Sequence, residues 1–265
     1  MEINNLFSVK GKVAVVTGGS RGIGEMITAG FLANGAKVYI SARKAPALIE
    51  KAKELSERYN AECIAIPSDL STIEGIESFT KVIEEKEGTI DFLINNAGAA
   101  WGEPFENFSE AGWDKVMDLN VKSMFFMTQK MTPLLKPNAS NEDPSRVVNI
   151  GSIDGLNVPM FPTFSYSTSK AAVHHLTRVL SAQLVSQNIL VNAIAPGPYP
   201  SAMLGSAVQG DYSEIEKKNP RKRVGSPEDI AGLVIFLCSR AGAYTVGETI
   251  TSDGGIVKTS GHNLG

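Results

Sequence analysis

The 265-residue sequence contains only two cysteines, Cys63 and Cys238, which lie far apart and form no C-x-x-C pair. A disulfide framework and a thiolate zinc site are therefore poorly supported, and we expect no metal. No apolar run approaches the ~20 residues of a membrane-spanning helix, and residues 1–10 lack the charged and apolar regions of a secretion signal. The net charge of −3 creates no general attraction for nucleic acid or anionic lipid. We therefore expect a soluble, cytoplasmic protein that binds neither nucleic acid nor a membrane.

Short β-branched runs alternate along the chain with segments that have the length and apolar spacing of helices. The expected strands are residues 12–16, 37–41, 62–66, 90–94, 146–150, 189–195 and 248–251. This alternation predicts an α/β fold in which helices cover both faces of a doubly wound, seven-stranded parallel sheet. The polar stretch 137–144 is expected to be a surface loop. No linker divides the chain, so we expect a single domain over residues 1–265, with residues 1–10 as an N-terminal arm.

A glycine-rich turn joins the first expected strand to the first expected helix and reads Thr17-Gly18-Gly19-Ser20-Arg21-Gly22-Ile23-Gly24. Such a turn lets the backbone approach a pyrophosphate, while the helix N-terminus offers unpaired N–H groups to its negative charge. The spacing differs from G-x-G-x-x-G, and a plain tight turn would explain the glycines alone equally well. The position of the turn favours dinucleotide binding by Gly18, Ser20, Arg21, Gly22, Ile23 and Gly24.

The second expected strand ends in Ser41-Ala42-Arg43-Lys44, without the carboxylate that often binds the ribose hydroxyls of NAD. Arg43 can instead pair with a 2′-phosphate, and Arg21 is a second cation on the same side. The alternative is that both are ordinary surface arginines. Asp69, next to Leu70, could accept a hydrogen bond from an adenine amino group or could cap a helix. The missing acid favours NADP(H) over NAD.

Tyr166 and Lys170 are four residues apart, so they share one face of a helix. A free tyrosine has a pKa near ~10 and is a poor acid–base catalyst at neutral pH. A nearby ammonium group favours the phenolate and lowers that pKa. The pair is common by chance, and core packing or a surface contact would also explain it.

Five motifs in one order carry a family resemblance: the glycine turn, Asn95-Asn96-Ala97-Gly98, Asn149-Ile150-Gly151-Ser152, Tyr166 to Lys170, and Pro196-Gly197. This order resembles that of the short-chain dehydrogenases/reductases, over about residues 7–257. The resemblance implies a Rossmann fold and NADP(H)-dependent oxidoreduction of a carbonyl or alcohol, an activity of the EC 1.1.1 type.

The resemblance also implies roles for single residues. Tyr166 would protonate the carbonyl oxygen, Ser152 would hydrogen-bond the substrate oxygen, and Lys170 would bind the nicotinamide ribose and depress the pKa of Tyr166. Asn120 would hold a water chain behind the lysine, although it could equally be a kink or capping residue. The remaining cofactor contacts implied by the family are Asn96, Ala97, Gly98, Pro196, Gly197 and Ser201.

Two departures from the family pattern affect the site. Ser152 and Tyr166 are fourteen positions apart, one more than we expect for the family, so the loop between them must bulge. Ser201 stands where a threonine often contacts the nicotinamide amide. Residues 198–220 follow this motif, and we expect an irregular, mobile lid over the substrate, within 201–219 in particular.

The sequence is most similar to 3-oxoacyl thioester (acyl-carrier-protein) reductases, including rhamnolipid-pathway ketoreductases. The partner would be a small carbonyl compound or an acyl thioester, and Lys217, Lys218, Arg221, Lys222 and Arg223 could form a basic surface for a thioester carrier. One alternative is a broad ketone, polyol or steroid reductase. A second is a catalytically silent NADP(H)-binding regulator, which should lack the acid–base residues that this chain has. The family resemblance also favours a homotetramer, with a dimer as the alternative, assembled through helices containing residues 116–131 and 165–184.

Overall fold

The computed structural model describes residues 3–159 and 161–259. Its sheet has the strand order β3-β2-β1-β4-β5-β6-β7, and every neighbouring pair is parallel. The strands are β1 (Val13–Thr17), β2 (Lys37–Ala42), β3 (Cys63–Pro67), β4 (Phe92–Asn95), β5 (Ser145–Ile150), β6 (Ile189–Pro196) and β7 (Thr249–Ser252). The predicted seven-stranded, doubly wound parallel sheet is confirmed.

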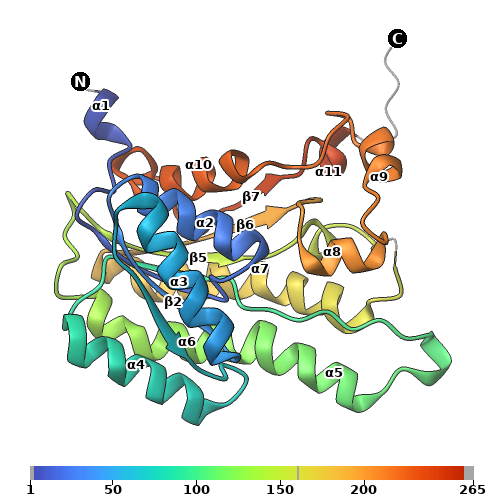
Figure 1. Cartoon of the computed structure of the whole chain (residues 1–265), viewed down its shortest axis with the longest axis horizontal. Helices are drawn as coiled ribbons and strands as arrows, with labels where there is room; N and C mark the ends of the chain where they lie inside the picture. The colour runs from blue at the N-terminus through green and yellow to red at the C-terminus, as the bar shows by residue number, and fades with distance from the viewer. Residues whose placement is uncertain (1–2, 160, 260–265) are drawn as a thin grey trace.

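Helices cover both faces of the sheet (Figure 1). One layer consists of α2 (Gly22–Ala33), α3 (Ala45–Tyr59) and α10 (Pro227–Cys238). The opposite layer is formed by α4 (Ile73–Glu87), α5 (Glu110–Met117), α6 (Ser123–Leu135) and α7 (Phe164–Leu184). Shorter helices are α1 (Ile3–Leu6), α8 (Ala202–Ala207), α9 (Ser213–Lys218) and α11 (Ile256–Thr259).

The two-residue period of the strands divides the core between these layers. On β1, Ala14 and Val16 pack with α2, α3 and α10, whereas Val15 packs with α4 and α6. All three side chains are buried completely. The strands are apolar on both faces because both faces are covered.

The two ends of the expected N-terminal arm are not equivalent. Residues 3–6 form the short helix α1, and Val9 is fully buried in the core on the α2 side. Residues 1–2 lie outside the described part. The part of the arm next to β1, which contains Val9, therefore packs as part of the core.

The strand order reverses between β1 and β4. Strand β1 pairs with β2 on one side and with β4 on the other. The loops that leave β1 and β4 diverge to opposite faces there and open a crevice at the carboxyl ends of the strands. The glycine turn, the Asn96 segment, Ser152 and the Pro196 segment all follow the carboxyl ends of strands, so the topology brings them together.

Candidate active site

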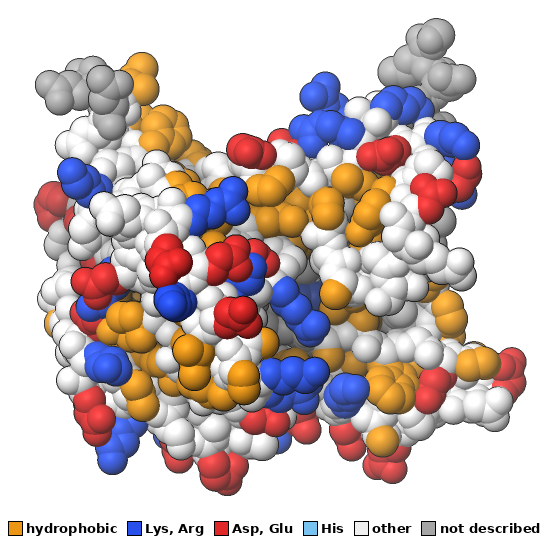
Figure 2. Space-filling model, viewed as in Figure 1, with side chains coloured by type: hydrophobic (Ala, Val, Ile, Leu, Met, Phe, Trp, Pro, Cys, Tyr) orange, Lys and Arg blue, Asp and Glu red, His pale blue; other side chains and the backbone are white. Residues whose placement is uncertain are grey.

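A cleft of about 1080 Å³ opens at the carboxyl ends of the strands. Figure 2 shows the hollow between the α2–α3 side and the α8–α9 side of the molecule, with hydrophobic side chains beside it. Almost every predicted site residue lines it: Gly18, Ser20, Arg21, Gly22, Ile23, Gly24, Arg43, Asp69, Leu70, Asn96, Ala97, Gly98, Ser152, Tyr166, Lys170, Pro196, Gly197 and Ser201. The exception is Asn120, which is fully buried behind the cleft wall.

The glycine turn forms one wall of the cleft and needs its glycines. Gly18 and Gly22 have φ values of 65° and 54°, in the left-handed region that favours glycine. A Cβ on Gly24 would lie 2.2 Å from the Gly18 carbonyl oxygen. Helix α2 begins at Gly22, and no side chain caps it at Arg21. Its first N–H groups are therefore available to an anion in the cleft.

The Asn96 segment is tied to the glycine turn by hydrogen bonds. The Asn96 side-chain amide donates to the carbonyls of Thr17 at 2.9 Å and Gly18 at 3.2 Å. The backbone N–H groups of Asn96 and Ala97 both donate to the Thr17 hydroxyl, at 2.9 and 3.0 Å. These contacts fix the two loops that flank the change in strand order.

Arg21 and Arg43 are exposed on the glycine-turn side of the cleft. Asp69 lies near Arg43, but Ser71 donates to its carboxylate from both the hydroxyl, at 2.7 Å, and the backbone N–H, at 3.1 Å. These hydrogen bonds are the main reason that the pKa of Asp69 is below its usual range, with Arg43 adding attraction. Thr72, rather than Asp69, is the N-cap of α4. Asp69 thus closes a turn at the cleft edge.

Asn120 lies in a π-helical turn, Asp118–Lys122, which joins α5 to α6. Its side chain accepts from Ala99 N–H at 2.8 Å and donates to the Ala99 carbonyl at 3.0 Å. It also donates to the Ser169 hydroxyl at 2.9 Å, on the helix that carries Tyr166 and Lys170. Asn120 therefore holds the loop after β4 against α7. The sequence left open a kink or a cap at this position, and the structure has a π-helical turn there.

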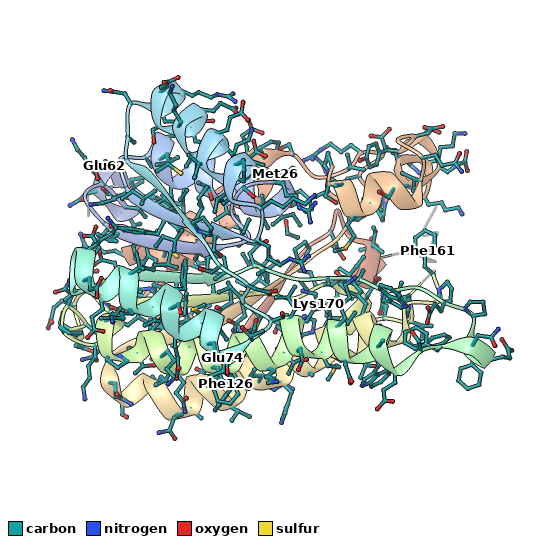
Figure 3. All side chains as sticks on the ribbon, turned by 60° about the horizontal axis from the view of Figure 1, so that its bottom comes forward. Met26, Glu62, Glu74, Phe126, Phe161 and Lys170 are labelled. Carbon is teal, nitrogen blue, oxygen red and sulfur yellow. The ribbon has the colours of Figure 1, made fainter. Side chains whose placement is uncertain are left out.

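Ser152, Tyr166 and Lys170 meet at the other end of the cleft. Lys170 is 5% exposed, its Nζ donates to the Ile150 carbonyl at 2.8 Å, and this Nζ lies 5.5 Å from the centre of the Tyr166 ring. In Figure 3, Lys170 lies in the interior, whereas Phe161 lies at the outer side of the molecule near α8 and α9. The Ser152 hydroxyl accepts from the Asp154 backbone N–H at 3.1 Å.

Burial dominates the electrostatics of this group. It raises the pKa of Tyr166 to about 12, against a lowering contact with the Ser152 hydroxyl and with a further increase from the Asp154 charge. Burial also lowers the pKa of Lys170 to about 8. The expected depression of the Tyr166 pKa by Lys170 is not seen in this structure, in which desolvation of the phenol dominates and only the Ser152 hydroxyl lowers the pKa.

Ser201 begins the expected lid. Its hydroxyl accepts from Leu204 N–H at 3.2 Å, which makes it the N-cap of α8, and its Cβ approaches the turn at Gly22. The expectation of an irregular segment after it is wrong, since α8 and α9 occupy most of 201–219. Helices α8 and α9 have only six residues each, too few to show a periodic pattern of apolar residues in the sequence.

The expected basic surface is largely satisfied internally. Lys217 pairs with Glu214 at 2.7 Å, and Lys222 donates to the Lys217 carbonyl at 2.7 Å. Arg223 pairs with Asp229. Of the five cations, only Lys218 lines the cleft.

Sequence reasoning assigned no site role to two titratable groups, Asp154 in the lining of the cleft and His174, which is buried behind Gly151. Asp154 lines the cleft two positions after Ser152, a spacing that could have identified it. His174 follows Lys170 by one helical turn and is buried at 4% exposure against Gly151, where a Cβ would lie 2.2 Å from Nε2. No pattern in the sequence separates His174 from the adjacent His175. Over residues 3–159 and 161–259, no group of three or more His, Cys, Asp or Glu could hold a metal ion. No helix in that same part is long and apolar enough to cross a membrane.

Comparisons with known proteins agree on one family. Residues 18–257 match the family model described as "Enoyl-(Acyl carrier protein) reductase". The chain is 44% identical over 255 residues to the rhamnolipids biosynthesis 3-oxoacyl-[acyl-carrier-protein] reductase of Pseudomonas aeruginosa, covering 94% of this chain and 97% of the relative. It is 36% identical over 261 residues to the 2-dehydro-3-deoxy-D-gluconate 5-dehydrogenase of Escherichia coli, covering 96% and 98%.

A solved structure supports the same grouping. The Pseudomonas aeruginosa RhlG/NADP active-site complex superimposes with a TM-score of 0.91 at 43% identity, covering 97% of this chain and 100% of the other. Fold, motif order and relatives agree with the resemblance drawn from the sequence. The chain therefore belongs to the short-chain dehydrogenase/reductase family of oxidoreductases.

Proposed function

We propose that this protein reduces a ketone to a secondary alcohol with NADPH, and that its substrate is most like a 3-oxoacyl thioester. The observation that carries the proposal is the arrangement of one cleft: cations and open helix N–H groups at one end, and Ser152, Tyr166 and Lys170 at the other. A relative 44% identical is named a 3-oxoacyl-[acyl-carrier-protein] reductase, and a neighbouring structure is an NADP complex.

The cleft has the features that a phosphorylated dinucleotide requires. The N-terminus of α2 and the crowded glycine turn would hold the pyrophosphate, since a Cβ at Gly24 would fill the cradle. Arg21 and Arg43 would pair with a 2′-phosphate, and Asp69 with Leu70 would lie along the adenosine. Near the catalytic end the contacts would come from Asn96, Ala97, Gly98, Pro196, Gly197 and Ser201. NADPH supplies the hydride when it is bound.

The chain's own residues would handle the proton. With a pKa near 12, Tyr166 stays protonated at neutral pH and can donate its proton to a carbonyl oxygen. Ser152 would donate a hydrogen bond to the same oxygen and stabilise the charge that develops there. Lys170 would bind the ribose hydroxyls, while Asn120 keeps α7 and the loop after β4 in register.

The substrate side of the cleft is mainly apolar. Its lining includes Val158, Phe161, Met203, Leu204, Val208 and Ile215. Burial of a methylene group is worth about 0.8 kcal/mol, so an acyl chain would bind better there than a polyol. Residues 198–220, with α8 and α9, would act as the lid that covers this chain.

The experiment is NADPH oxidation by the purified protein with an acetoacetyl thioester, in parallel with NADH and with simple ketones and diketones. Turnover of the thioester with NADPH supports both parts of the proposal. Turnover of small ketones alone would retain a carbonyl reductase and remove the acyl thioester. Equal rates with NADH would show that Arg21 and Arg43 do not select a phosphate.

A broad ketone, polyol or steroid reductase is the second candidate, because a relative 36% identical is named as a dehydrogenase of a sugar acid. A silent NADP(H)-binding regulator is the third. The presence of Ser152, Tyr166 and Lys170 around one cleft argues against it. Tight NADPH binding without turnover of any carbonyl would favour it.

We further propose a cytoplasmic homotetramer, with a dimer as the alternative. Large apolar side chains are exposed on α5, α6 and α7, namely Trp113, Phe125, Phe164 and Val179. Exposed apolar faces of this kind mark interfaces between subunits. Both cysteines are free and buried, which suits a reducing compartment.

A further inference from the structure

Asp154 is a carboxylate on the substrate side of a mainly apolar cleft. It lies in the 3-10 turn Ile153–Gly155, directly after Ser152, and its backbone N–H is held by the Ser152 hydroxyl at 3.1 Å. The turn is pressed onto α7, since a Cβ on Gly155 would lie 2.5 Å from the Lys170 carbonyl carbon. Asp154 is therefore fixed in place beside the reacting groups.

The side chain of Asp154 has no hydrogen-bond or ion-pair partner among residues 3–159 and 161–259. Partial burial raises its pKa, and its charge in turn raises the pKa of Tyr166. An unpaired carboxylate in such surroundings is costly, so it is a candidate for contact with a ligand. The charge is felt at the phenol that would donate the proton.

None of the other charged groups that line the described part of the cleft forms an ion pair with this carboxylate, and the pKa of Asp154 is raised by burial. Helix α9 contributes Glu214, which is paired with Lys217, and Lys218. Lys170 on α7 donates its hydrogen bond to the Ile150 carbonyl. His174, on the same helix, is neutral at pH 7 because burial lowers its pKa to about 4. Asp154 is thus the acidic group that an incoming substrate meets next to Ser152 and Tyr166.

We propose that Asp154 selects substrates by charge, admitting uncharged 3-oxoacyl esters and thioesters and rejecting the free 3-oxo acid with the same carbonyl. The reaction requires negative charge to develop on the carbonyl oxygen at Tyr166. A second negative charge on the substrate, close to Asp154, is repelled in the ground state and in the transition state. This inference rests on the proposed ketone reduction.

The test compares methyl acetoacetate with acetoacetate, which differ in one charge and share the ketone. The readout is the ratio of their kcat/KM values with NADPH at pH 7.5. Wild type should favour the ester, and Asp154→Asn, which keeps the shape and removes the charge, should reduce the ratio by about 10-fold or more. Asp154→Glu keeps the charge and should retain a ratio close to that of wild type.

Asp114→Asn is the matched control, since it removes an exposed carboxylate of α5 outside the cleft and should leave the ratio unchanged. NADPH binding, followed by its fluorescence, verifies that each variant is folded. An unchanged ratio in Asp154→Asn, with the ester still reduced, would overturn the inference and leave the proposed function intact. Failure of wild type to reduce the ester or any other ketone would instead overturn the proposed function.

Discussion

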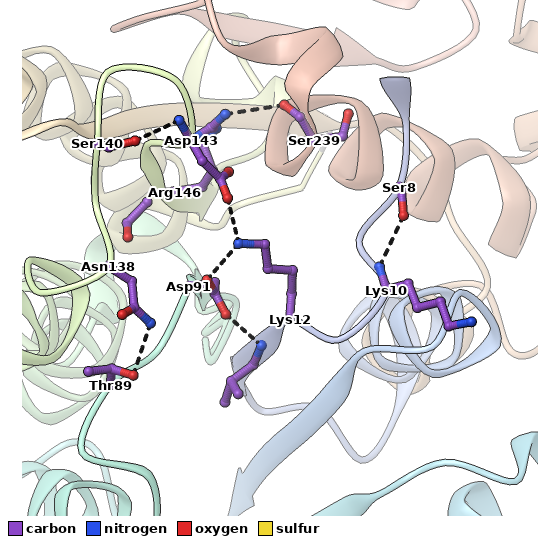
Figure 4. A network of polar contacts seen from close by, with 12 residues as sticks. Ser8, Lys10, Lys12, Thr89, Asp91, Asn138, Ser140, Asp143, Arg146 and Ser239 are labelled. Carbon is purple, nitrogen blue, oxygen red and sulfur yellow. Dashed lines mark hydrogen bonds and ion pairs between the residues drawn. The ribbon is translucent and has the colours of Figure 1, made fainter. Parts of the chain in front are cut away.

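The charged groups at the two ends of the parallel sheet differ in whether they are paired within the protein. At the amino ends of the strands, Lys12 pairs with Asp91 at 2.9 Å and with Asp143 at 2.7 Å (Figure 4). The same Asp91 accepts from the Val13 backbone N–H at 2.8 Å. One lysine thereby joins β1 to the segments before β4 and β5.

Arg146 of β5 also lies at this end and is 1% exposed. It donates to the carbonyls of Leu237 at 3.1 Å and Ser239 at 3.2 Å, where helix α10 ends. A cation at a helix C-terminus satisfies carbonyls that the helix leaves unpaired. Lys12 and Arg146 at the amino end are thus engaged by groups of the chain itself, although Nη1 of Arg146 has no hydrogen-bond partner among the described residues.

At the carboxyl ends, the corresponding groups remain available. The N-terminus of α2 has no side-chain cap, and Asp154 faces the cleft. Arg43 is exposed nearby. The comparison teaches that charged groups at the amino end are paired within the protein and stabilise the fold, whereas those at the carboxyl end are available to a ligand. Substitutions at the two ends should therefore separate activity from stability.

The largest effect is expected for Tyr166→Phe. Removal of the hydroxyl should lower kcat by about 10²- to 10⁴-fold, the usual contribution of general acid catalysis, and should leave NADPH affinity and Tm nearly unchanged. Steady-state rates and a thermal melt check both halves. Tyr244→Phe, at a fully exposed tyrosine, is the control and should change neither. Undiminished turnover in Tyr166→Phe would contradict the role of Tyr166 as the general acid at the carboxyl end of the sheet.

Arg146→Ala should show the reverse pattern. Two carbonyls lose their donor and a cavity forms, so the free energy of unfolding should fall by about 3 kcal/mol. The variant should keep the kcat/KM of wild type at temperatures where it is folded. Urea unfolding measures the first quantity. Lys10→Ala removes an exposed cation near the same end as a control, and equal losses in both variants would argue against a specific role for Arg146.

A smaller effect is expected for Arg43→Ala. Loss of the guanidinium should lower kcat/KM for NADPH about 10-fold and leave that for NADH unchanged, because only NADPH carries the 2′-phosphate. Lys44→Ala changes the adjacent cation, which does not line the cleft. A similar loss with both cofactors in Arg43→Ala would mean that the residue supports the fold of the loop instead of selecting the phosphate.

The pH dependence should be the mildest contrast. Lys170 is charged below its pKa of about 8 and neutral above it, so kcat/KM for NADPH should decline as the pH rises through 8, while Tyr166 stays protonated. Stability should not decline with it. A lysine with a depressed pKa disfavours folding only while it is charged. At the other end, hydrogen bonds to Asp143 and Asp91 outweigh burial and raise the pKa of Lys12, so its ion pairs persist. An activity profile flat to pH 9.5 would contradict this role of Lys170.

The positions of the strands could be predicted from the sequence because buried parallel strands are apolar throughout. The observed β2 (Lys37–Ala42) and β6 (Ile189–Pro196) each extend one residue beyond the predicted range. Residues before each turn, such as Ala42, are extended without being strongly β-forming. The order of the strands was not predicted, since local patterns carry no information about which strands are neighbours in the sheet.

The members of the site were predictable where the backbone itself demands a residue type, as at Gly18 and Gly22. What could not be predicted is which groups remain unpaired. Ser201 caps α8, and Asp69 is engaged by Ser71. The hydrogen-bond partners of such residues depend on the conformation of short loops, in which a polar side chain has several possible partners nearby. The spacing of Asp154 from Ser152 could have placed it near the site, but a sequence does not show that a carboxylate lacks a partner.

The most direct test of the account is transfer of deuterium from NADPH labelled at both C4 positions to an acetoacetyl thioester. Mass spectrometry of the product should show one deuterium on the new secondary alcohol carbon for each cofactor oxidised, and the Tyr166→Phe variant should yield almost none. Oxidation of the cofactor without deuterium in the alcohol, or tight binding with no oxidation for any carbonyl, would contradict hydride transfer at the carboxyl end of this sheet.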